Sequence, residues 1–260
     1  MDLGLSGKRA LVTGSNSGIG AGIARMLAAE GAAVIVHGRD AARTRAMAAE
    51  IGAAGIALGD LGTNDGADAV AIAAGDVDIL VNNAGGAAGT SAMDWCEVDE
   101  AGWIETYQMN VIAAVRMIRR LLPAMKASGW GRIVNIASAA GTQPIAQGPD
   151  YGAAKGATLN MTASLARSLR SCGVTVNSVS PGMILTPAVE TWRDGLAARP
   201  DMQGMSAAQI EAQLAGHAAL GRIGRVEEIA HVVCMIASPH NGYMTGANVR
   251  VDGGLVQSVN

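Results

Sequence analysis

The stretch RALVTGSNSGIG, residues 9–20, joins a short apolar segment to a glycine-rich turn. Its first six residues are predicted to form a strand because they are mostly apolar. Gly14, Gly18 and Gly20 then permit a tight turn and a close approach of the backbone to a ligand. A helix that begins at about Ile19 would aim its free N–H groups at a diphosphate. Glycine loops are common in α/β proteins, so this interpretation needs support from the rest of the chain.

Short apolar runs alternate with helical patterns along the whole chain. Strands are predicted at residues 9–14, 32–38, 55–60, 77–85, 132–138, 174–182 and 248–254, and helices near 19–30, 40–51, 101–127, 152–171 and 226–237. Most of the strands are apolar on both faces, which is typical of a parallel sheet covered by helices on each side. The pattern predicts an α/β fold, a doubly wound parallel sheet of about seven strands in a three-layer Rossmann-type sandwich.

The composition narrows the class of protein. The 260 residues are half hydrophobic, which is enough for one large core, so residues 1–260 are expected to form a single domain. The 19 basic and 22 acidic residues are spread evenly, which argues against a nucleic-acid partner. The first ten residues do not read as a targeting signal, and no apolar run approaches the roughly 20 residues of a membrane span. Three scattered cysteines indicate reduced thiols in a cytoplasm, and the histidine spacing predicts no catalytic metal.

In such a fold, ligands bind at the carboxyl ends of the strands. After the second strand, Gly38 leaves empty the position where an acid would bind the ribose of NAD, and Arg39 supplies a cation for the extra phosphate of NADP. NADP is therefore favoured, with NAD as the alternative if Arg39 is a solvated charge and Asp40 binds the ribose or caps the helix. The third strand ends at Asp60-Leu61, suited to an adenine edge, and the fourth at Asn82–Gly85, suited to line adenosine.

Several motifs occur together in one order, and with them the chain resembles the short-chain dehydrogenase/reductase family in its compact single-domain form. TGSNSGIG resembles the family's TGxxxGxG, NNAG its NNAG, YGAAK its YxxxK, SPGMILT its PGxxxT and VDGG its closing strand. Asn110 and Ser138 match the helix asparagine and the serine, and Ser138 stands thirteen residues before Tyr151. The resemblance covers nearly the whole chain, and the chain is similar to family members that act as 3-oxoacyl reductases.

Tyr151 and Lys155 are four residues apart, so on a helix they lie on one face. A phenol ordinarily has a pKa of about 10, and a nearby ammonium, helped by a cationic nicotinamide, would pull that value toward neutral pH. Tyr151 is therefore expected to act as the general acid and base of a hydride transfer between nicotinamide and carbonyl carbon. The alternative is an ordinary amphipathic pair on a helix surface.

The resemblance implies the other roles. Ser138 would hold and polarise the carbonyl oxygen, Lys155 would also hold the nicotinamide ribose, and Asn110 would keep a water in a proton relay. Thr186 and the backbone near Ile184 would fix the carboxamide. The expected cofactor site is Gly14, Ser15, Asn16, Ser17, Gly18, Ile19, Gly20, Arg39, Asp60, Leu61, Asn82, Ala84, Gly85, Asn110, Tyr151, Lys155, Pro181, Gly182, Ile184 and Thr186.

The chain departs from the family pattern at two places. Only 21 residues separate Asp60 from Asn82, which leaves room for a short helix where the family usually has a longer one. Ser17 precedes Gly18, where many NADP-using members carry a basic residue. Arg39 is therefore expected to carry the phosphate largely alone, with Ser15 or Arg43 as its helpers.

Residues 187–220 are expected to form a substrate lid of two short helices. Trp192, Met202, Met205 and Leu214 offer an apolar surface there, unless they only pack the lid. Gln143, Gln147 and Trp192 are expected to border the pocket together with Ser138 and Tyr151. No basic cluster would hold an anion, so a neutral ketone or secondary alcohol is favoured.

Other functions stay open at this stage. A 3-oxoacyl thioester on a carrier protein and a sugar or polyol are alternative substrates. A non-catalytic cofactor-binding sensor is the alternative from another class, since a fold alone does not prove catalysis. An epimerase or dehydratase of nucleotide-sugars would need a larger C-terminal region.

The helix from Ala153 to Leu169 is apolar on most sides, with charge only at Lys155 and Arg167. Such a helix must be covered on both faces, and the simplest second cover is the same helix of another subunit. The chain is therefore expected to be a homo-oligomer, and the resemblance implies a homotetramer.

Overall fold

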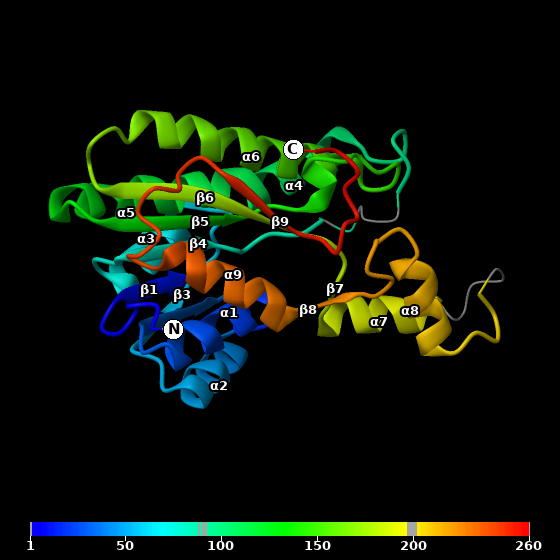
Figure 1. The fold of residues 1–260 in the computed structure, drawn as a ribbon, viewed down its shortest axis with the longest axis horizontal. Helices are drawn as coiled ribbons and strands as arrows, with labels where there is room; N and C mark the ends of the chain where they lie inside the picture. The colour runs from blue at the N-terminus through cyan, green and yellow to red at the C-terminus, as the bar shows by residue number, and fades with distance from the viewer. Residues whose placement is uncertain (1, 88, 90–92, 197–201, 260) are drawn as a thin grey trace.

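The computed structural model describes residues 2–87, 89, 93–196 and 202–259. Its centre is a parallel sheet in the order β3-β2-β1-β4-β5-β6-β9. The strands are β1 (Arg9–Val12), β2 (Ala33–Gly38), β3 (Gly55–Leu58), β4 (Ile79–Asn82), β5 (Gly131–Ile136), β6 (Val174–Pro181) and β9 (Asn248–Val251). This sheet, with helices on both faces, confirms the predicted fold class (Figure 1). The strand order reverses between β1 and β4, where such sheets bind ligands.

Nine α-helices lie within the described residues. They are α1 (Gly18–Ala29), α2 (Ala41–Ile51), α3 (Asn64–Ala74), α4 (Glu100–Tyr107), α5 (Ala113–Ser128), α6 (Pro149–Ser168), α7 (Pro187–Leu196), α8 (Ala207–Ala215) and α9 (Val226–Ala237). Helix α3 is the short helix expected between Asp60 and Asn82, and the Thr63 side chain caps it by accepting from the Gly66 N–H at 3.1 Å. No described helix is both long and apolar enough to cross a membrane.

The strands contribute side chains to two hydrophobic cores, because successive side chains of a strand point to opposite faces of the sheet. On β1, Ala10 and Val12 pack with residues of α1, α2 and α9, whereas Leu11 packs with residues of α3 and α5. The same alternation on β4 places Ile79 in the first core and Leu80 in the second. The five inner strands, β2, β1, β4, β5 and β6, are therefore buried on both faces, as their composition predicted, whereas the edge strands β3 and β9 are only partly buried.

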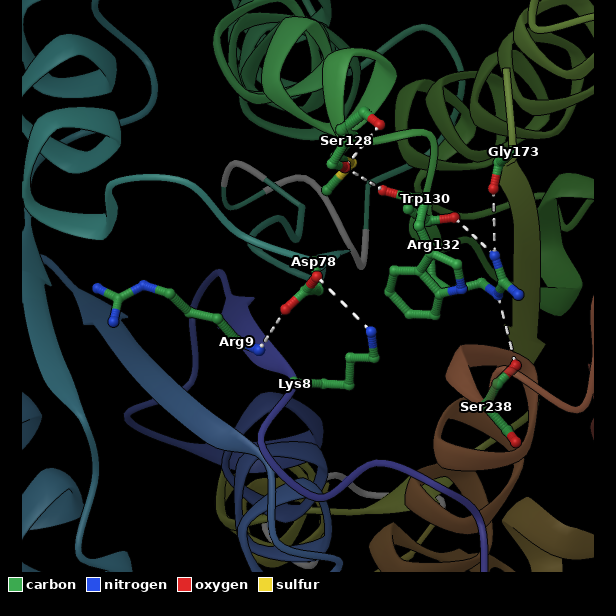
Figure 2. A network of polar contacts seen from close by, with 10 residues as sticks. Lys8, Arg9, Asp78, Ser128, Trp130, Arg132, Gly173 and Ser238 are labelled. Carbon is green, nitrogen blue, oxygen red and sulfur yellow. Dashed lines mark hydrogen bonds and ion pairs between the residues drawn. The ribbon is translucent and has the colours of Figure 1, made fainter. Parts of the chain in front are cut away.

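The amino ends of the strands are joined by a polar network around Trp130 (Figure 2). The Lys8 Nζ and the Arg132 Cζ lie 3.9 Å and 4.5 Å from the Trp130 ring centroid. Arg132 is buried and donates to the Ser238 oxygen at 3.4 Å, and Asp78 accepts from the Arg9 N–H at 2.9 Å. These contacts connect β1, β4, β5 and α9 at the edge opposite the carboxyl ends of the strands.

The single helix predicted over residues 101–127 contains an irregularity. Helices α4 and α5 are joined by one π-helical turn, Gln108–Ile112, which holds Asn110. A π turn inserts one extra residue, and such turns are frequent at functional sites. Apolar periodicity could not reveal it because the turn continues the helix without a break.

Helices α7 and α8 extend beyond the end of the sheet, joined to it by the short strands β7 (Ile184–Leu185) and β8 (Gly224–Arg225) (Figure 1). They share a small core of Leu196, Met202 and Ile210, separate from the two main cores. These are the two short helices expected between residues 187 and 220, of which residues 197–201 lie outside the described residues.

Candidate active site

The glycine-rich turn is held against the end of β4. The Thr13 hydroxyl accepts from the N–H groups of Asn83 and Ala84 at 2.9 Å and 3.0 Å. The Asn83 amide in turn donates to the Thr13 and Gly14 oxygens at 2.9 Å and 3.2 Å. Gly14 has φ +65°, and a Cβ there would stand 3.0 Å from the Ala84 Cα. The turn therefore requires glycine at this position, as the motif implied.

A cleft of about 680 Å³ opens over this turn at the carboxyl ends of the strands. Sixteen of the twenty predicted cofactor residues line it: Gly14, Asn16, Ser17, Gly18, Ile19, Arg39, Asp60, Leu61, Ala84, Gly85, Tyr151, Lys155, Pro181, Gly182, Ile184 and Thr186. The lining residues that sequence reasoning missed include His37 and Val189. His37 gave no signal because a histidine inside an apolar strand matches no nucleotide-binding pattern.

The other four predicted residues lie behind the cleft surface. Ser15 is fully buried, and its hydroxyl accepts from the His37 N–H at 2.9 Å. Asn82 is buried and donates to the Asn135 Oδ1 at 2.8 Å. Gly20 packs under the turn, where a Cβ would stand 2.4 Å from the Gly14 oxygen. Ser15, Asn82 and Gly20 support the turn and the sheet and do not line the cleft. Asn110 does not line the cleft either.

Gly38 has a steric reason for being glycine. A Cβ at this position would stand 2.2 Å from the Asn16 Nδ2 and 2.5 Å from the Thr44 Oγ1. An acidic side chain at residue 38 would collide with both, so the end of β2 carries no carboxylate toward the cleft. Arg39 is exposed and lies 4.0 Å from the Asp60 carboxylate, while Asp40 caps α2 by accepting from the Arg43 N–H at 3.0 Å.

Tyr151 and Lys155 lie on the inner face of α6, which begins with Pro149 directly after the left-handed Gly148. The Lys155 Nζ is 5.5 Å from the Tyr151 ring centroid and donates to the Ile136 oxygen at 2.9 Å. Ser138 follows β5 and starts a 3-10 turn, its hydroxyl accepting from the Ala140 N–H at 3.2 Å. Sequence reasoning placed these three side chains together, and the fold brings them to one place.

Burial governs the acidity of this pair. It raises the pKa of the Tyr151 phenol above its ordinary value, and the hydrogen bond with the Ser138 hydroxyl acts in the opposite direction. It also lowers the pKa of the Lys155 ammonium to about 8. The sequence predicted a lowered pKa for the Tyr151 phenol, whereas the pKa in this structure is raised. Desolvation raises it by more than the hydrogen bond with Ser138 lowers it.

Asn110 clamps the loop that follows β4. Its Nδ2 donates to the Gly86 and Thr106 oxygens at 2.6 Å and 2.8 Å, and its Oδ1 accepts from the Gly86 N–H at 3.1 Å. A Cβ at Gly85 would stand 2.5 Å from the Asn110 Oδ1 and 3.6 Å from the Lys155 Nζ. The π turn thus brings Asn110 to the same corner as the lysine.

A second cavity of about 1150 Å³ adjoins the cleft. Ser138 and Tyr151 are among the residues that line both cavities, so the two spaces meet beside them. Met202 and Leu214 line the second cavity from the α7–α8 region. Gln143 lines it too, but its Oε1 accepts from the Gln257 N–H at 2.9 Å and so holds the C-terminal segment.

The expectation that Gln147 and Trp192 border the substrate pocket is not met in this geometry. Gln147 is exposed in the loop before α6, and Trp192 on α7 is 42% exposed and outside the lining of both cavities. The next residue, Arg193, is the one that faces α8, and its guanidinium pairs with Glu211. A helical surface pattern does not tell which of two adjacent residues turns inward.

The residues of the cleft fit a dinucleotide. The Ser17 side chain makes no capping hydrogen bond at the start of α1, and the first turn of α1 has no acidic residue. Those N–H groups are suited to a diphosphate. A Cβ at Gly14 would collide with Ala84 and one at Gly38 with Asn16 and Thr44, so glycine at both positions lets the segments around the turn pack closely. No group of three or more His, Cys, Asp or Glu side chains among the described residues could hold a metal ion.

Comparisons with known proteins agree with this geometry. The oxidoreductase YvaG of Bacillus subtilis is 38% identical over 269 residues, covering 100% of both chains. The 3-oxoacyl-acyl-carrier-protein reductase FabG of Vibrio cholerae is 35% identical and covers 97% of this chain and 99% of its own. The crystal structure of L-sorbose reductase from Gluconobacter frateurii, complexed with NADPH and L-sorbose, matches with a TM-score of 0.92 at 33% identity over 100% of both chains.

The family model for short chain dehydrogenases matches residues 8–197, which include the glycine-rich turn and the Ser138, Tyr151 and Lys155 set. The motifs, the sheet order and the full-length relatives therefore agree. This chain belongs to the short-chain dehydrogenase family and is an oxidoreductase.

Proposed function

We propose that this chain uses NADPH to reduce a neutral ketone to a secondary alcohol, and that the same site runs the reverse oxidation. The observation that carries the proposal is that Ser138 and Tyr151 line both the cleft and the adjoining cavity. A nicotinamide in the first and a ketone in the second would meet at these two hydroxyl groups. Catalytic groups must lie within reach of the reacting atoms, and this corner meets that condition.

NADPH in the cleft would supply a hydride to the carbonyl carbon. As the carbonyl π bond breaks, Tyr151 gives its phenolic proton to the oxygen, which completes the alcohol. Ser138 donates a hydrogen bond to the same oxygen and stabilises the negative charge that develops there. The Lys155 ammonium would stabilise the tyrosinate that remains, and it would also hold the nicotinamide ribose. Asn110 maintains the proton relay that restores the phenol.

The cofactor preference rests on the end of β2. Gly38 offers no carboxylate to a ribose, whereas the exposed Arg39 guanidinium can form two parallel hydrogen bonds to a phosphate. The L-sorbose reductase relative was crystallised with NADPH, which supports the same preference. NADH is the weaker cofactor in this proposal.

A neutral substrate is proposed because the two arginines that line the second cavity already have hydrogen-bond partners. Arg222 donates to both Glu228 carboxylate oxygens at 2.9 Å and 2.6 Å, and Arg250 donates to the Ser258 oxygen at 2.7 Å. A neutral carbonyl compound therefore fits this lining better than an anion does. A 3-oxoacyl thioester and a ketose are the substrate classes that two relatives suggest.

The region of residues 187–220 is proposed as the substrate lid of a single catalytic domain, because Met202 and Leu214 face the cavity. The chain is further proposed to work in the cytoplasm, without a nucleic-acid partner, as a homotetramer. The support for assembly is α4, where Ile104 is 62% exposed and Tyr107 is 44% exposed.

The test is the loss of NADPH absorbance with a panel of neutral ketones, 3-oxoacyl thioesters and ketoses. Tyr151→Phe removes the proton donor and is expected to lower kcat by about 10²- to 10⁴-fold, the range typical of general acid–base catalysis, with NADPH affinity retained. Tyr243→Phe, at a fully exposed tyrosine, is the matched control and should behave as wild type.

Two results would contradict the proposal. One is a Tyr151→Phe variant that keeps the wild-type rate. The other is tight cofactor binding without turnover of any substrate class, which would favour the non-catalytic sensor instead.

A further inference from the structure

His37 lies at the carboxyl end of β2 and lines the cleft, although it is buried. Its main chain pairs with Ser15 in both directions: the His37 N–H donates to the Ser15 hydroxyl, and the Ser15 N–H donates to the His37 oxygen, each at 2.9 Å. The main chain of His37 alone therefore holds Ser15 of the glycine-rich turn in place.

The imidazole adds two contacts of its own. The Gly14 N–H donates to the His37 Nδ1 at 2.8 Å, and the His37 Nε2 lies 3.1 Å from the Gly59 oxygen. A backbone N–H can only donate and a carbonyl can only accept, so Nδ1 must carry the lone pair and Nε2 the proton. These partners select one neutral tautomer and exclude the imidazolium, which would face the Gly14 N–H with a second donor.

Gly14 is consequently held from two sides. The His37 ring receives its N–H, and the Asn83 amide donates to its carbonyl oxygen. The Asn83 contact belongs to the NNAG motif, whereas nothing in the glycine pattern predicted the histidine. The ring also spans from the turn after β1 to the end of β3, where Asp60 and Leu61 line the cleft.

We propose that His37 is a positioning residue for the dinucleotide, and that its neutral imidazole holds the Gly14 peptide, and with it the glycine-rich turn, in the shape that binds the diphosphate. The inference rests on the proposed binding of a dinucleotide in this cleft and adds a pH-sensitive control to it. His37 acts through the turn and takes no part in hydride transfer.

The surroundings favour the neutral ring. Burial lowers the pKa of His37, while the Gly59 carbonyl and the Asp60 carboxylate oppose that effect and the Arg39 guanidinium adds to it. The other charged groups beside this end of the cleft, Asp40 and Arg43, lie 3.6 Å from each other and pair. Affinity should therefore be constant near neutral pH and fall as acid protonates Nδ1.

The experiment compares wild type with His37→Phe and His37→Asn by calorimetric titration of NADP⁺ between pH 5 and pH 8. Phe keeps a ring of similar size but accepts no hydrogen bond, whereas Asn places an amide oxygen where Nδ1 stands. Leaving the buried Gly14 N–H unpaired should weaken binding about tenfold in His37→Phe at pH 7.5, seen in steady state as a higher KM for NADPH rather than a lower kcat.

His37→Asn should restore most of that affinity and should lose the extra weakening that wild type shows toward acidic pH, because an amide does not titrate. The 2′-phosphate of the ligand titrates equally in every variant, so the difference in slope belongs to His37. If His37→Phe does not fold, the comparison of wild type with His37→Asn still decides.

The inference is overturned if His37→Phe binds NADP⁺ as wild type does, or if wild type and His37→Asn share one pH profile. Failure of wild type itself to bind NADP⁺ or NAD⁺ would instead sink the proposed function, so the two failures are distinguishable.

Discussion

A single buried residue of the candidate site, Lys155, lowers the stability of the fold at neutral pH. Its side chain is buried, and the pKa of its ammonium is lowered to about 8 because burial disfavours the charged form. The unfolded chain, with an ordinary lysine pKa near 10.4, binds more protons between pH 8 and pH 10 than the folded chain does. Lys155 therefore destabilises the fold below about pH 8, and this cost is relieved as the pH rises through that window.

Replacement of this lysine should stabilise the protein while it removes the activity. At pH 7, Lys155→Met is expected to raise the free energy of unfolding by about 2 kcal/mol, after allowance for the lost hydrogen bond to the Ile136 oxygen. Urea unfolding at pH 7 and pH 10 measures this, and the advantage of the variant should shrink at the higher pH. A variant that is less stable than wild type at pH 7 would show that the ammonium stabilises the fold.

Contact between α1 and α9 shows how one small residue sets the distance between two elements. Gly22 lies on the face of α1 that meets the start of α9, and a Cβ there would stand 2.1 Å from the Val226 Cγ1. Valine is stiff at χ1, so the collision cannot be relieved by a simple rotation. The close packing of α1 on α9 therefore depends on the absence of a side chain at Gly22.

Gly22→Ala is expected to destabilise the fold by about 1–3 kcal/mol through overpacking. In a Val226→Ala background the same change should be neutral or stabilising by about 0.5–1 kcal/mol, because alanine is the better helix former. Urea midpoints of the two single variants and the double variant complete this cycle. Equal effects of Gly22→Ala in both backgrounds would exclude Val226 as the cause.

Assembly belongs to the scale of the whole molecule. Ile104 and Tyr107 are exposed on α4, and α4 packs beside α6. On α6, the side chains of Leu159, Met161 and Leu165 are only half-buried. An exposed apolar surface of this kind favours association with a second copy. The proposed homotetramer would bury these side chains.

Sedimentation velocity at micromolar concentration should give a species of four times the 26.2 kDa chain mass. Ile104→Glu should shift the distribution toward smaller species, because it places a charge in the proposed contact. Ile72→Glu is the matched control, since Ile72 is 82% exposed on α3 and away from α4. A single monomer peak for wild type would contradict the assembly.

The sequence by itself determined the sheet, most of the helices and the Ser138, Tyr151 and Lys155 set. Local apolar patterns report which faces of a segment are buried, and glycines in a turn report a local conformation. Motif spacing then predicted that Ser138, which follows β5, lies together with Tyr151 and Lys155 of α6. The same reasoning anticipated a short α3 because the number of residues between two strand ends limits what can join them.

Only the tertiary structure decided which partners the polar side chains have. In the structure, His37 contacts Gly14 and Gly59, Asn82 is hydrogen-bonded to Asn135, and Gln143 is hydrogen-bonded to Gln257. Trp192 is exposed. Each of these pairs joins residues far apart in the chain, so no local pattern encodes it. A buried polar group must find a partner, but the identity of that partner depends on how distant elements pack.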